Sequence, residues 1–432
     1  MSSLPTLSRR RVLGAGAVAA IGALAGCSTA SPVDSAPWSP PTDAWPQARY
    51  GPRNTGRNPN AAVPVDGVSE RWRAPAPGEP SGVVAQREHL AAFGPAGLVV
   101  LDRASDETVH TDHVPAERVA FGPPGSGGEP DLYAAGAIGL PDGTDVTAVR
   151  AWELGDRTGQ RFLTVQRGLG RQAIDHLIAG EGRLYVGGRG EGRTTTAIEA
   201  ATGDTVWRAT GARPALIDDG VLTGSQIGVA CVGPRGGLDA LVNDGPRLRW
   251  ETHTARTRTP PAVTDDTAVV GTGGVPGTPS GVVAVSTVDG DHRWEPVETP
   301  AGVRSVAIDG DTALSSHVVT ETVGRVAVPT SGGLRAVGLS DGRVDWERGT
   351  DWVPHCVALD GEGLAVVAGG HPPGERYPDP PDPDRRDVLR CHAVATGERL
   401  WRHRTPTPVE AVALVGETVY AVCAGGSGRA LG

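Results

Sequence analysis

The sequence has 432 residues, with 62 glycines, 37 prolines and a formal net charge of −10 at pH 7. That length accommodates one large domain or several smaller ones, and the many glycines and prolines favour short strands and turns over long helices. The negative charge argues against nucleic acid or an anionic membrane surface as the main partner.

Residues 1–27 are predicted to be an export signal and not part of the fold. Three arginines at positions 9–11 precede an apolar stretch, residues 12–25, that is too short to span a bilayer comfortably. The arginine pair is similar to a twin-arginine signal, and Leu24-Ala25-Gly26-Cys27 is similar to a lipobox in which Cys27 is lipidated. The alternative is an uncleaved N-terminal anchor. Both interpretations place the rest of the chain on the outer face of the cytoplasmic membrane.

Residues 28–44 are rich in serine, proline and alanine. Such a composition is typical of an extended tether, which would hold the following domain away from the membrane. Residues 45–432 are predicted to form one domain, because a repeated sequence pattern runs through nearly all of them.

The repeated pattern is an apolar β-rich run, a turn of the Thr-Gly or Asp-Gly type, and an aromatic residue. "ATGDTVW" and "ATGERLW" are two copies. The aromatic positions are His110, Phe162, Trp207, Trp250, Trp294, Trp346 and Trp401. Their spacing of about 43 to 55 residues is the period of a propeller blade, in which four short antiparallel strands are joined by turns.

The two ends of the chain supply the parts of one further blade. Only three strands are predicted after Trp401, whereas "VSERWRAP" at residues 68–75 is an isolated fourth strand that carries Trp72. We therefore predict an all-β, eight-bladed propeller of four-stranded antiparallel blades, with the ring closed by the N-terminal strand. Seven blades is the alternative if the unit ending at Phe162 is not a blade.

The repeat, the eightfold count and "WPQARYGPRNTGRNPN" at residues 45–60 resemble the pyrroloquinoline-quinone-like (PQQ-like) propeller family. This family includes quinoprotein dehydrogenases and a non-enzymatic lipoprotein that assists outer-membrane barrel assembly. The acidic balance and the absence of lysine resemble proteins of salt-loving archaea. A tryptophan on the fourth strand is large and flat enough to fill the wedge between neighbouring blades. This blade-packing role is predicted for Trp72, Trp207, Trp250, Trp294, Trp346 and Trp401.

Enzymatic activity is not expected. Resemblance to the dehydrogenases would imply a disulfide between adjacent cysteines, together with Glu, Asn and Asp ligands for calcium beside the quinone. The sequence has no adjacent cysteines, and Asn243 is the only asparagine after residue 60. We therefore predict no catalytic residue, no metal site, and neither PQQ nor calcium as cofactor. Four cysteines are predicted to be buried free thiols, with two disulfides as the alternative: Cys231, Cys356, Cys391 and Cys423.

The loops between the second and third strands of the blades are the best candidates for function, because long loops on a rigid scaffold often carry binding residues. The longest is "HPPGERYPDPPDPDRRD" at residues 371–387. Its candidate partner-binding residues are Glu375, Arg376, Tyr377, Asp379, Asp382, Asp384 and Arg385. Two alternatives stay open for this loop: a solvated acidic surface, and a cation site on its three aspartates.

Together these features predict a monomeric, non-catalytic module that binds or scaffolds protein partners of the cell envelope and contacts the membrane only through its lipid. A PQQ-dependent dehydrogenase-like enzyme is one alternative. A lipoprotein that holds a small solute at the propeller axis is another.

Overall fold

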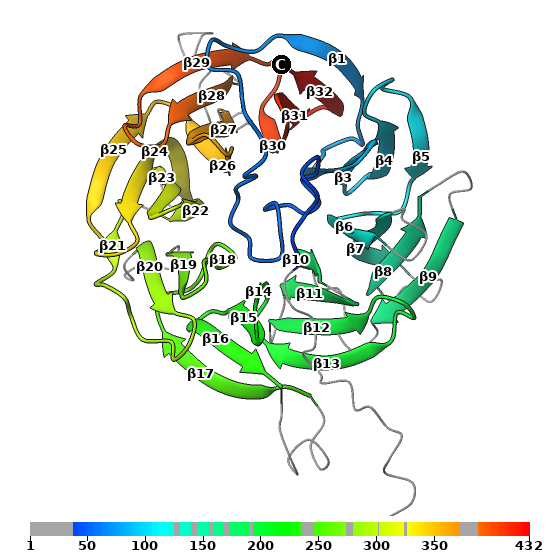
Figure 1. Ribbon diagram of the computed structural model, residues 1–432, viewed down its shortest axis with the longest axis horizontal. Coiled ribbons are helices and arrows are strands. Elements are labelled where there is room, and N and C mark those ends of the chain that lie inside the picture. Colours follow the sequence, from blue (N-terminus) through cyan, green and yellow to red (C-terminus); the bar gives the residue numbers. More distant parts are fainter. Residues whose placement is uncertain are drawn as a thin grey trace, which may run out of the picture.

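The computed structural model describes residues 38–124, 130–139, 145–154, 159–166, 173–180, 182–189, 193–234, 245–273, 280–300, 302–323, 326–370 and 388–432. These residues form eight four-stranded antiparallel sheets arranged in a ring (Figure 1). The predicted eight-bladed propeller is confirmed, and the seven-bladed alternative is wrong. Across the ranges just given, no helix is long and apolar enough to cross a membrane.

The first four blades follow one another along the chain. Blade 1 contains β2 (Gly82–Gln86), β3 (His89–Gly94), β4 (Gly97–Asp102) and β5 (Thr108–Asp112). Blade 2 contains β6 (Arg118–Pro124), β7 (Pro130–Gly139), β8 (Asp145–Glu153) and β9 (Gly159–Gln166). Blade 3 contains β10 (Ala173–Ala179), β11 (Arg183–Arg189), β12 (Thr194–Glu199) and β13 (Thr205–Thr210). Blade 4 contains β14 (Arg213–Ile217), β15 (Gly220–Gly224), β16 (Gly228–Gly233) and β17 (Arg247–His253).

The remaining blades complete the ring. Blade 5 contains β18 (Ala262–Val263), β19 (Thr267–Thr272), β20 (Gly281–Ser286) and β21 (Val297–Glu298). Blade 6 contains β22 (Val303–Asp309), β23 (Thr312–Val323), β24 (Val326–Gly338) and β25 (Val344–Thr350). Blade 7 contains β26 (Val353–Leu359), β27 (Leu364–Gly370), β28 (Val388–Ala393) and β29 (Arg399–Arg404). Blade 8 contains β30 (Val409–Val415), β31 (Thr418–Cys423), β32 (Ser427–Leu431) and β1 (Glu70–Pro75).

Blade 8 joins the two ends of the domain. The N-terminal strand β1 pairs antiparallel with the C-terminal strand β32, from Glu70 opposite Leu431 to Pro75 opposite Ser427. This confirms the predicted closure. Because every blade then has a neighbour on both sides, the ring has no terminal blade.

Each blade runs from a buried inner strand to an exposed outer strand. In blade 1, for example, β2 is buried along its whole length, whereas β5 is mostly exposed. The connections between strands define two faces of the ring. We call the face with the first-to-second and third-to-fourth strand turns the turn face. The opposite face, with the second-to-third strand loops and the connections between blades, is the loop face.

The outer-strand tryptophans contact the next blade in a repeated way. The indole Nε1 of Trp250 donates to the Thr287 carbonyl oxygen at 3.2 Å, and that of Trp346 donates to Val394 at 2.7 Å. Each acceptor lies at the third-to-fourth strand turn of the following blade. Gly397 in such a turn has φ of 68°, and a Cβ there would lie 2.6 Å from the Trp346 ring. The tryptophan of one blade thus packs against the Thr-Gly turn of the next blade, which explains why both recur in the sequence.

Blade 5 departs from the predicted pattern. Trp294 donates from Nε1 to the Leu339 carbonyl at 3.0 Å, but it lies before the outer strand and not within it. That strand, β21, has only two residues, and Pro296 directly precedes it. Proline has no backbone N–H to donate to a ladder, which accounts for the interruption. The placement of Trp294 in a regular fourth strand was therefore wrong.

Candidate functional site

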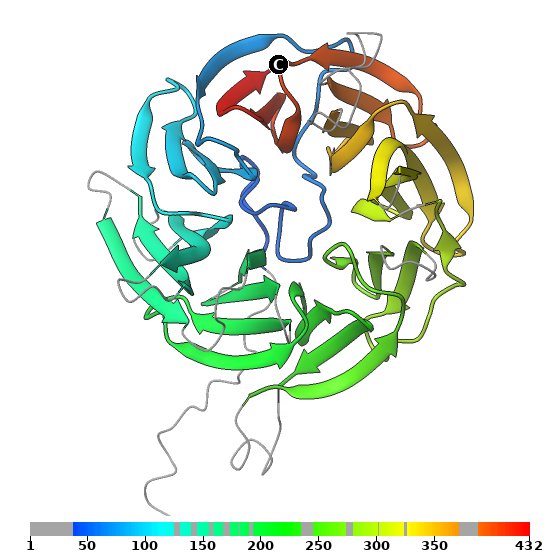
Figure 2. The same ribbon diagram turned by 180° about the vertical axis from the view of Figure 1, so that it is seen from behind.

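Residues 45–60, which we call the axial plug, run through the centre of the ring in both views (Figures 1 and 2). Trp45 and Ala85 of blade 1 exchange backbone hydrogen bonds of 2.6 and 2.8 Å. Five more inner strands donate a backbone amide to a plug carbonyl oxygen at 2.8 to 2.9 Å: Phe121, Leu216, Val263, Ile308 and Leu359. These residues lie at or near the turn-face ends of the inner strands. The plug therefore closes the axis at the turn face.

Side chains connect the plug to the two remaining blades. Gln47 donates from Nε2 to the Ala179 carbonyl of blade 3 at 2.8 Å. Asn58 is fully buried and donates from Nδ2 to Leu414 of blade 8 at 2.7 Å and to Ala44 at 3.1 Å. One continuous segment thus bonds to all eight blades, which satisfies backbone groups that would otherwise face an empty channel.

Asn54 holds the plug between blades 3 and 4. Its Nδ2 donates to the Pro214 carbonyl at 2.9 Å, and its Oδ1 lies 2.8 Å from Nε2 of His176. Its φ of 54° lies in the left-handed region, which asparagine tolerates better than most residues. Burial, aided by the positive charge of Arg118, lowers the pKa of His176 to about 3. The ring is therefore neutral at pH 7, and its Nε2–H donates to Asn54.

Acidic turns on the turn face also pair with the plug. Arg53 lies 2.6 Å from Asp218 and 2.5 Å from Asp265, and Arg57 lies 2.8 Å from Asp309. All three aspartates lie at first-to-second strand turns, in blades 4, 5 and 6. These turns therefore also position the plug electrostatically.

Above the plug lies an axial cavity of about 220 Å³. Ala48 and Arg49 of the plug line it, and its walls come from the inner strands, including Gly82, His176 and Arg213. Pockets that bind drug-sized ligands commonly span about 300–1,000 Å³. The room left at the axis is therefore smaller than such a ligand needs.

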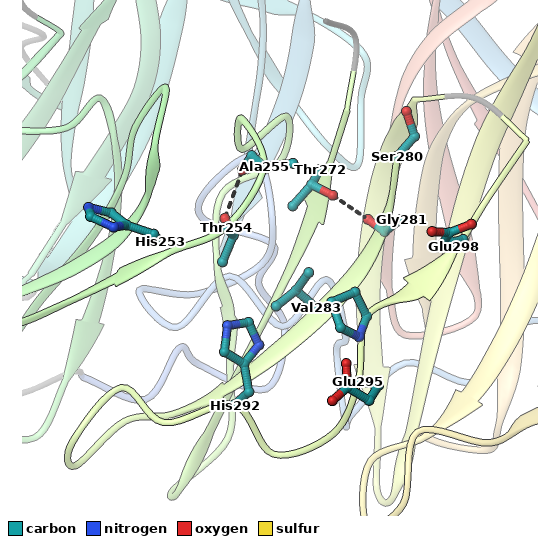
Figure 3. A pocket seen from close by; sticks show the side chains of 11 residues that line it. His253, Thr254, Ala255, Thr272, Ser280, Gly281, Val283, His292, Glu295 and Glu298 are labelled. Carbon is teal, nitrogen blue, oxygen red and sulfur yellow. Dashed lines mark hydrogen bonds between the residues drawn. The ribbon is translucent and has the colours of Figure 1, made fainter. Parts of the chain in front are cut away.

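A larger pocket, which we call the outer pocket, has a volume of about 430 Å³ and lies between blades 4 and 5 (Figure 3). Val283 of β20 lies at its centre in the close-up, with Thr254 on one side and Glu298 on the other. His292 and Glu295, from the interrupted segment before β21, also line it. The short outer strand of blade 5 thus leaves a pocket of ligand-binding size beside the loop face.

Some of the predicted site residues lie outside the described part of the chain, and others lie within it. Cys27 and the whole candidate loop lie outside the described residues, including Glu375, Arg376, Tyr377, Asp379, Asp382, Asp384 and Arg385. Trp207 is buried in a cluster with Tyr185 of its own blade and Leu216 of the next. Trp72 packs against Tyr420, with ring centroids 6.0 Å apart, and Trp401 donates from Nε1 to Pro64 at 2.7 Å.

All four predicted thiols are free in the structure, and three are buried as expected: Cys231, Cys391 and Cys423. Cys356 is only partly buried, so that part of the prediction was wrong. Burial raises the pKa of Cys231 to about 11 and that of Cys391 to about 12. These two thiols are therefore protonated at neutral pH and act as small apolar side chains.

The axial plug and the residues that fix it were not predicted from the sequence. A signal was present, because three of the four asparagines in the chain fall within residues 45–60. Asparagine side chains offer both donors and acceptors to backbone groups, so a local excess of them in a segment without strand periodicity indicates an irregular but bonded segment.

Comparisons with known proteins agree with this architecture. Residues 190–355, from the third blade into the seventh, match the family described as "Outer membrane protein assembly factor BamB". No curated protein matches the chain.

Solved structures share the fold at low identity. A quinohemoprotein alcohol dehydrogenase from Comamonas testosteroni has a TM-score of 0.58 and 11% identity, over 90% of this chain and 80% of that one. BamB from Moraxella catarrhalis has a TM-score of 0.53 and 12% identity, over 84% of this chain and 99% of that one. The computationally designed Ika8 protein has a TM-score of 0.58 and 11% identity, over 83% and 98%. An enzyme and a designed protein both share this ring, so the fold alone does not assign an activity. Residues 190–355 are thus similar to the BamB family, and the solved structures show that the chain shares the β-propeller fold.

Proposed function

We propose that this chain is a lipid-anchored, extracytoplasmic propeller that acts as a non-catalytic protein-binding or scaffold module and engages its partner through the loop face. One observation carries the proposal. The axis, where a propeller can hold a ligand, is occupied on its turn-face side by residues 45–60, and the cavity left above them is about 220 Å³. A partner or a ligand of ordinary size would therefore bind away from the axis, at the loops or in the outer pocket.

The path of the N-terminal segment supports an orientation on the membrane. Trp38 donates from Nε1 to the Ala179 carbonyl at 2.8 Å, and Arg103 donates to the Asp43 carbonyl at 2.8 Å. Both contacts are on the turn face. Residues 28–37 reach at most about 35 Å when fully extended. An anchor at Cys27 would therefore keep the turn face toward the membrane and present the loop face to partners.

Paired photo-crosslinking tests which face binds. Ile227 is 55% exposed between β15 and β16 on the loop face, and Val288 is 78% exposed between β20 and β21 on the turn face. A photoreactive residue at position 227 is expected to capture a protein partner in native membranes, whereas one at position 288 is not. Deleting residues 371–387 is expected to reduce the capture from position 227. Equal capture from both positions, or capture from position 288 alone, would contradict the proposal.

Two further measurements address catalysis and anchoring. The mature protein mixed with pyrroloquinoline quinone and Ca²⁺ is expected to show no oxidation of alcohols or sugars with a dye acceptor, and turnover would favour the dehydrogenase alternative. Cys27→Ala is expected to release the protein from the membrane fraction, because the lipid on Cys27 is the proposed anchor and membrane binding by a lipid grows with each buried CH₂ group. A membrane-bound variant would show that the anchor is not the lipid.

A further inference from the structure

A buried arginine recurs at one register position of the blades. It is found on the third strands of blades 2, 6, 7 and 8, as Arg150, Arg335, Arg390 and Arg429. Each directly precedes the residue that pairs with the aromatic position of the outer strand. Each is at most 7% exposed. A guanidinium at such depth needs acceptors and negative charge nearby to offset the loss of water.

Blade 7 differs from the other three in how this arginine is paired. In blades 2, 6 and 8 a carboxylate contacts the guanidinium closely: Asp112, Glu347 and Glu70. In blade 7, NH2 of Arg390 lies 3.5 Å from Asp351, at the limit of a hydrogen bond. The Arg390 guanidinium also lies 4.6 Å from the centroid of the Trp352 ring, a contact that holds its position. Arg390 therefore has the longest ion pair of the four arginines.

Arg390 lines a pocket of about 480 Å³ between blades 6 and 7, which we call the rim pocket. The outer strands of these two blades, β25 and β29, follow one another along the outer edge of the ring (Figure 1). Two more arginines line the pocket, Arg348 of β25 and Arg399 of β29, and both are exposed. Glu398 is the one carboxylate among the described lining residues. The volume lies within the range of sites that bind organic ligands.

Arg348 and Arg399 are accessible to a ligand. NH2 of Arg348 donates to the Thr396 carbonyl oxygen at 3.3 Å, which holds this side chain across the gap between the blades. Within the part of the chain that the structure describes, neither arginine has a carboxylate at ion-pair distance. Glu398 offsets part of their charge from the same lining, and an excess of positive charge remains.

A buried histidine in the lining of the pocket responds to this charge. His392 of β28 is 5% exposed, and its Nδ1 lies 3.2 Å from the Gly397 carbonyl oxygen. Burial lowers the pKa of His392, and the charges of the three arginines lower it further, against the opposing effect of the Gly397 hydrogen bond. The imidazole is therefore neutral at pH 7. All three guanidinium groups thus act on one point of the pocket, where a partly buried position strengthens their effect.

We propose that the rim pocket binds a small organic anion, a carboxylate or a phosphate ester, between the guanidinium groups of Arg348 and Arg399, with Arg390 supplying further positive charge from the wall. Arginine suits the role because its planar fork donates two parallel hydrogen bonds to a carboxylate or phosphate. A volume of about 480 Å³ leaves room for an organic body beside the oxyanion. The bound anion adds the negative charge that a close carboxylate of the chain supplies in blades 2, 6 and 8. The site does not depend on the proposed protein partner.

Isothermal titration calorimetry on the mature protein tests the site with three probes, tricarballylate, glycerol 3-phosphate and uncharged glycerol, at an ionic strength fixed with sodium chloride. At least one of the two anions is expected to bind with one-to-one stoichiometry, and glycerol is not. Binding of tricarballylate alone assigns a carboxylate ligand, binding of glycerol 3-phosphate alone assigns a phosphate ester, and binding of both shows that the pocket recognises either oxyanion. If neither anion binds, or if glycerol binds equally well, the proposal is wrong.

Matched variants at exposed positions locate the binding. Arg348→Met and Arg399→Met are each expected to raise the dissociation constant ~10-fold, because each removes a charge-assisted contact. Glu398→Gln is expected to lower it ~3-fold, since it removes the one carboxylate of the described lining. Arg343→Met is the control, because that side chain is 85% exposed in a turn of blade 6, and it is expected to bind as the wild type does. Unchanged affinity in both pocket-arginine variants, or weaker binding by Glu398→Gln, would overturn the assignment.

Discussion

The two faces of this propeller are built from the same blades but differ in what closes them at the axis. On the turn face, residues 45–60 bond to the inner strands of all eight blades and to acidic turns. On the loop face, the axial cavity and the outer pocket lie open beside loops of unequal length. The contrast teaches that a symmetric ring acquires two structurally different faces when an asymmetric segment of its own chain closes one end.

At neutral pH, the largest effects are expected from the asparagines that fix the plug. Asn54→Ala and Asn58→Ala are each expected to lower the free energy of unfolding by about 3 kcal/mol, because each removes a fully buried amide and leaves its partners unsatisfied. Urea unfolding followed by tryptophan fluorescence measures this loss. Asn60→Ala, at an exposed position of the same segment, is the control and is expected to change stability much less.

A loss as small in the two buried variants as in the control would indicate that the plug contributes little to the ring. The plug would then fill the axis without stabilising the ring, and the two faces would differ only in shape.

The contact between blades gives the next largest effect. Gly397→Ala is expected to destabilise the protein by about 2 kcal/mol, since it forces a Cβ onto φ of 68° and to within 2.6 Å of the Trp346 ring. Gly349→Ala is the matched control, because no atom lies within 4 Å of its added Cβ. Thermal unfolding compares them. Equal melting temperatures for the two variants would show that the tryptophan and the turn are not coupled.

Acidification is expected to weaken the plug through His176. Its pKa is about 3 in the folded protein against 6.5 in the unfolded chain, so the unfolded chain binds a proton that the folded protein does not. Stability should therefore fall as the pH drops below about 6.5, by up to ~1.4 kcal/mol per pH unit, until the pH nears 3. Between pH 6 and pH 4, the free energy of unfolding measured with urea should fall less in His176→Gln than in the wild type. Parallel curves would contradict the assignment of a neutral buried histidine.

The smallest effect is expected from the surface ion pairs of the plug. Arg53→Met should lower the free energy of unfolding by only roughly 0.5 kcal/mol, because Asp218 and Asp265 are 77% and 94% exposed and water screens them. The effect should diminish further in 1 M salt. A loss as large as that of Asn58→Ala would mean that charge pairing, and not buried hydrogen bonding, holds the plug.

The sequence was enough to predict the ring of blades but not the difference between its two faces. The regular spacing of the tryptophans and the isolated strand around Trp72 predicted eight blades and their closure, because each blade repeats one local pattern. Local patterns failed at blade 5, where Pro296 interrupts the outer strand after Trp294. The proline was visible in the sequence, but its effect depends on which neighbouring strand it would have to pair with.

The contacts of the plug were beyond sequence reasoning for a different reason. Asn58 and Leu414 are 356 positions apart, and Arg49 and Ser305 are 256 positions apart. Such contacts have no period and become apparent only once the ring brings the inner strands to a common axis. The candidate loop at residues 371–387 lies outside the described residues, so its role stays a prediction.

Hydrogen exchange at the inner-strand amides tests the central claim most directly. The amides of Leu216, Val263 and Ile308 donate to carbonyl oxygens of the plug at 2.8 to 2.9 Å. If the plug is an integral part of the ring, these amides should exchange only on global unfolding, as slowly as the amides within β15 and β19. Fast exchange at these three positions, while the amides of β15 and β19 stay protected, would show that the plug detaches from the folded ring and would contradict the account.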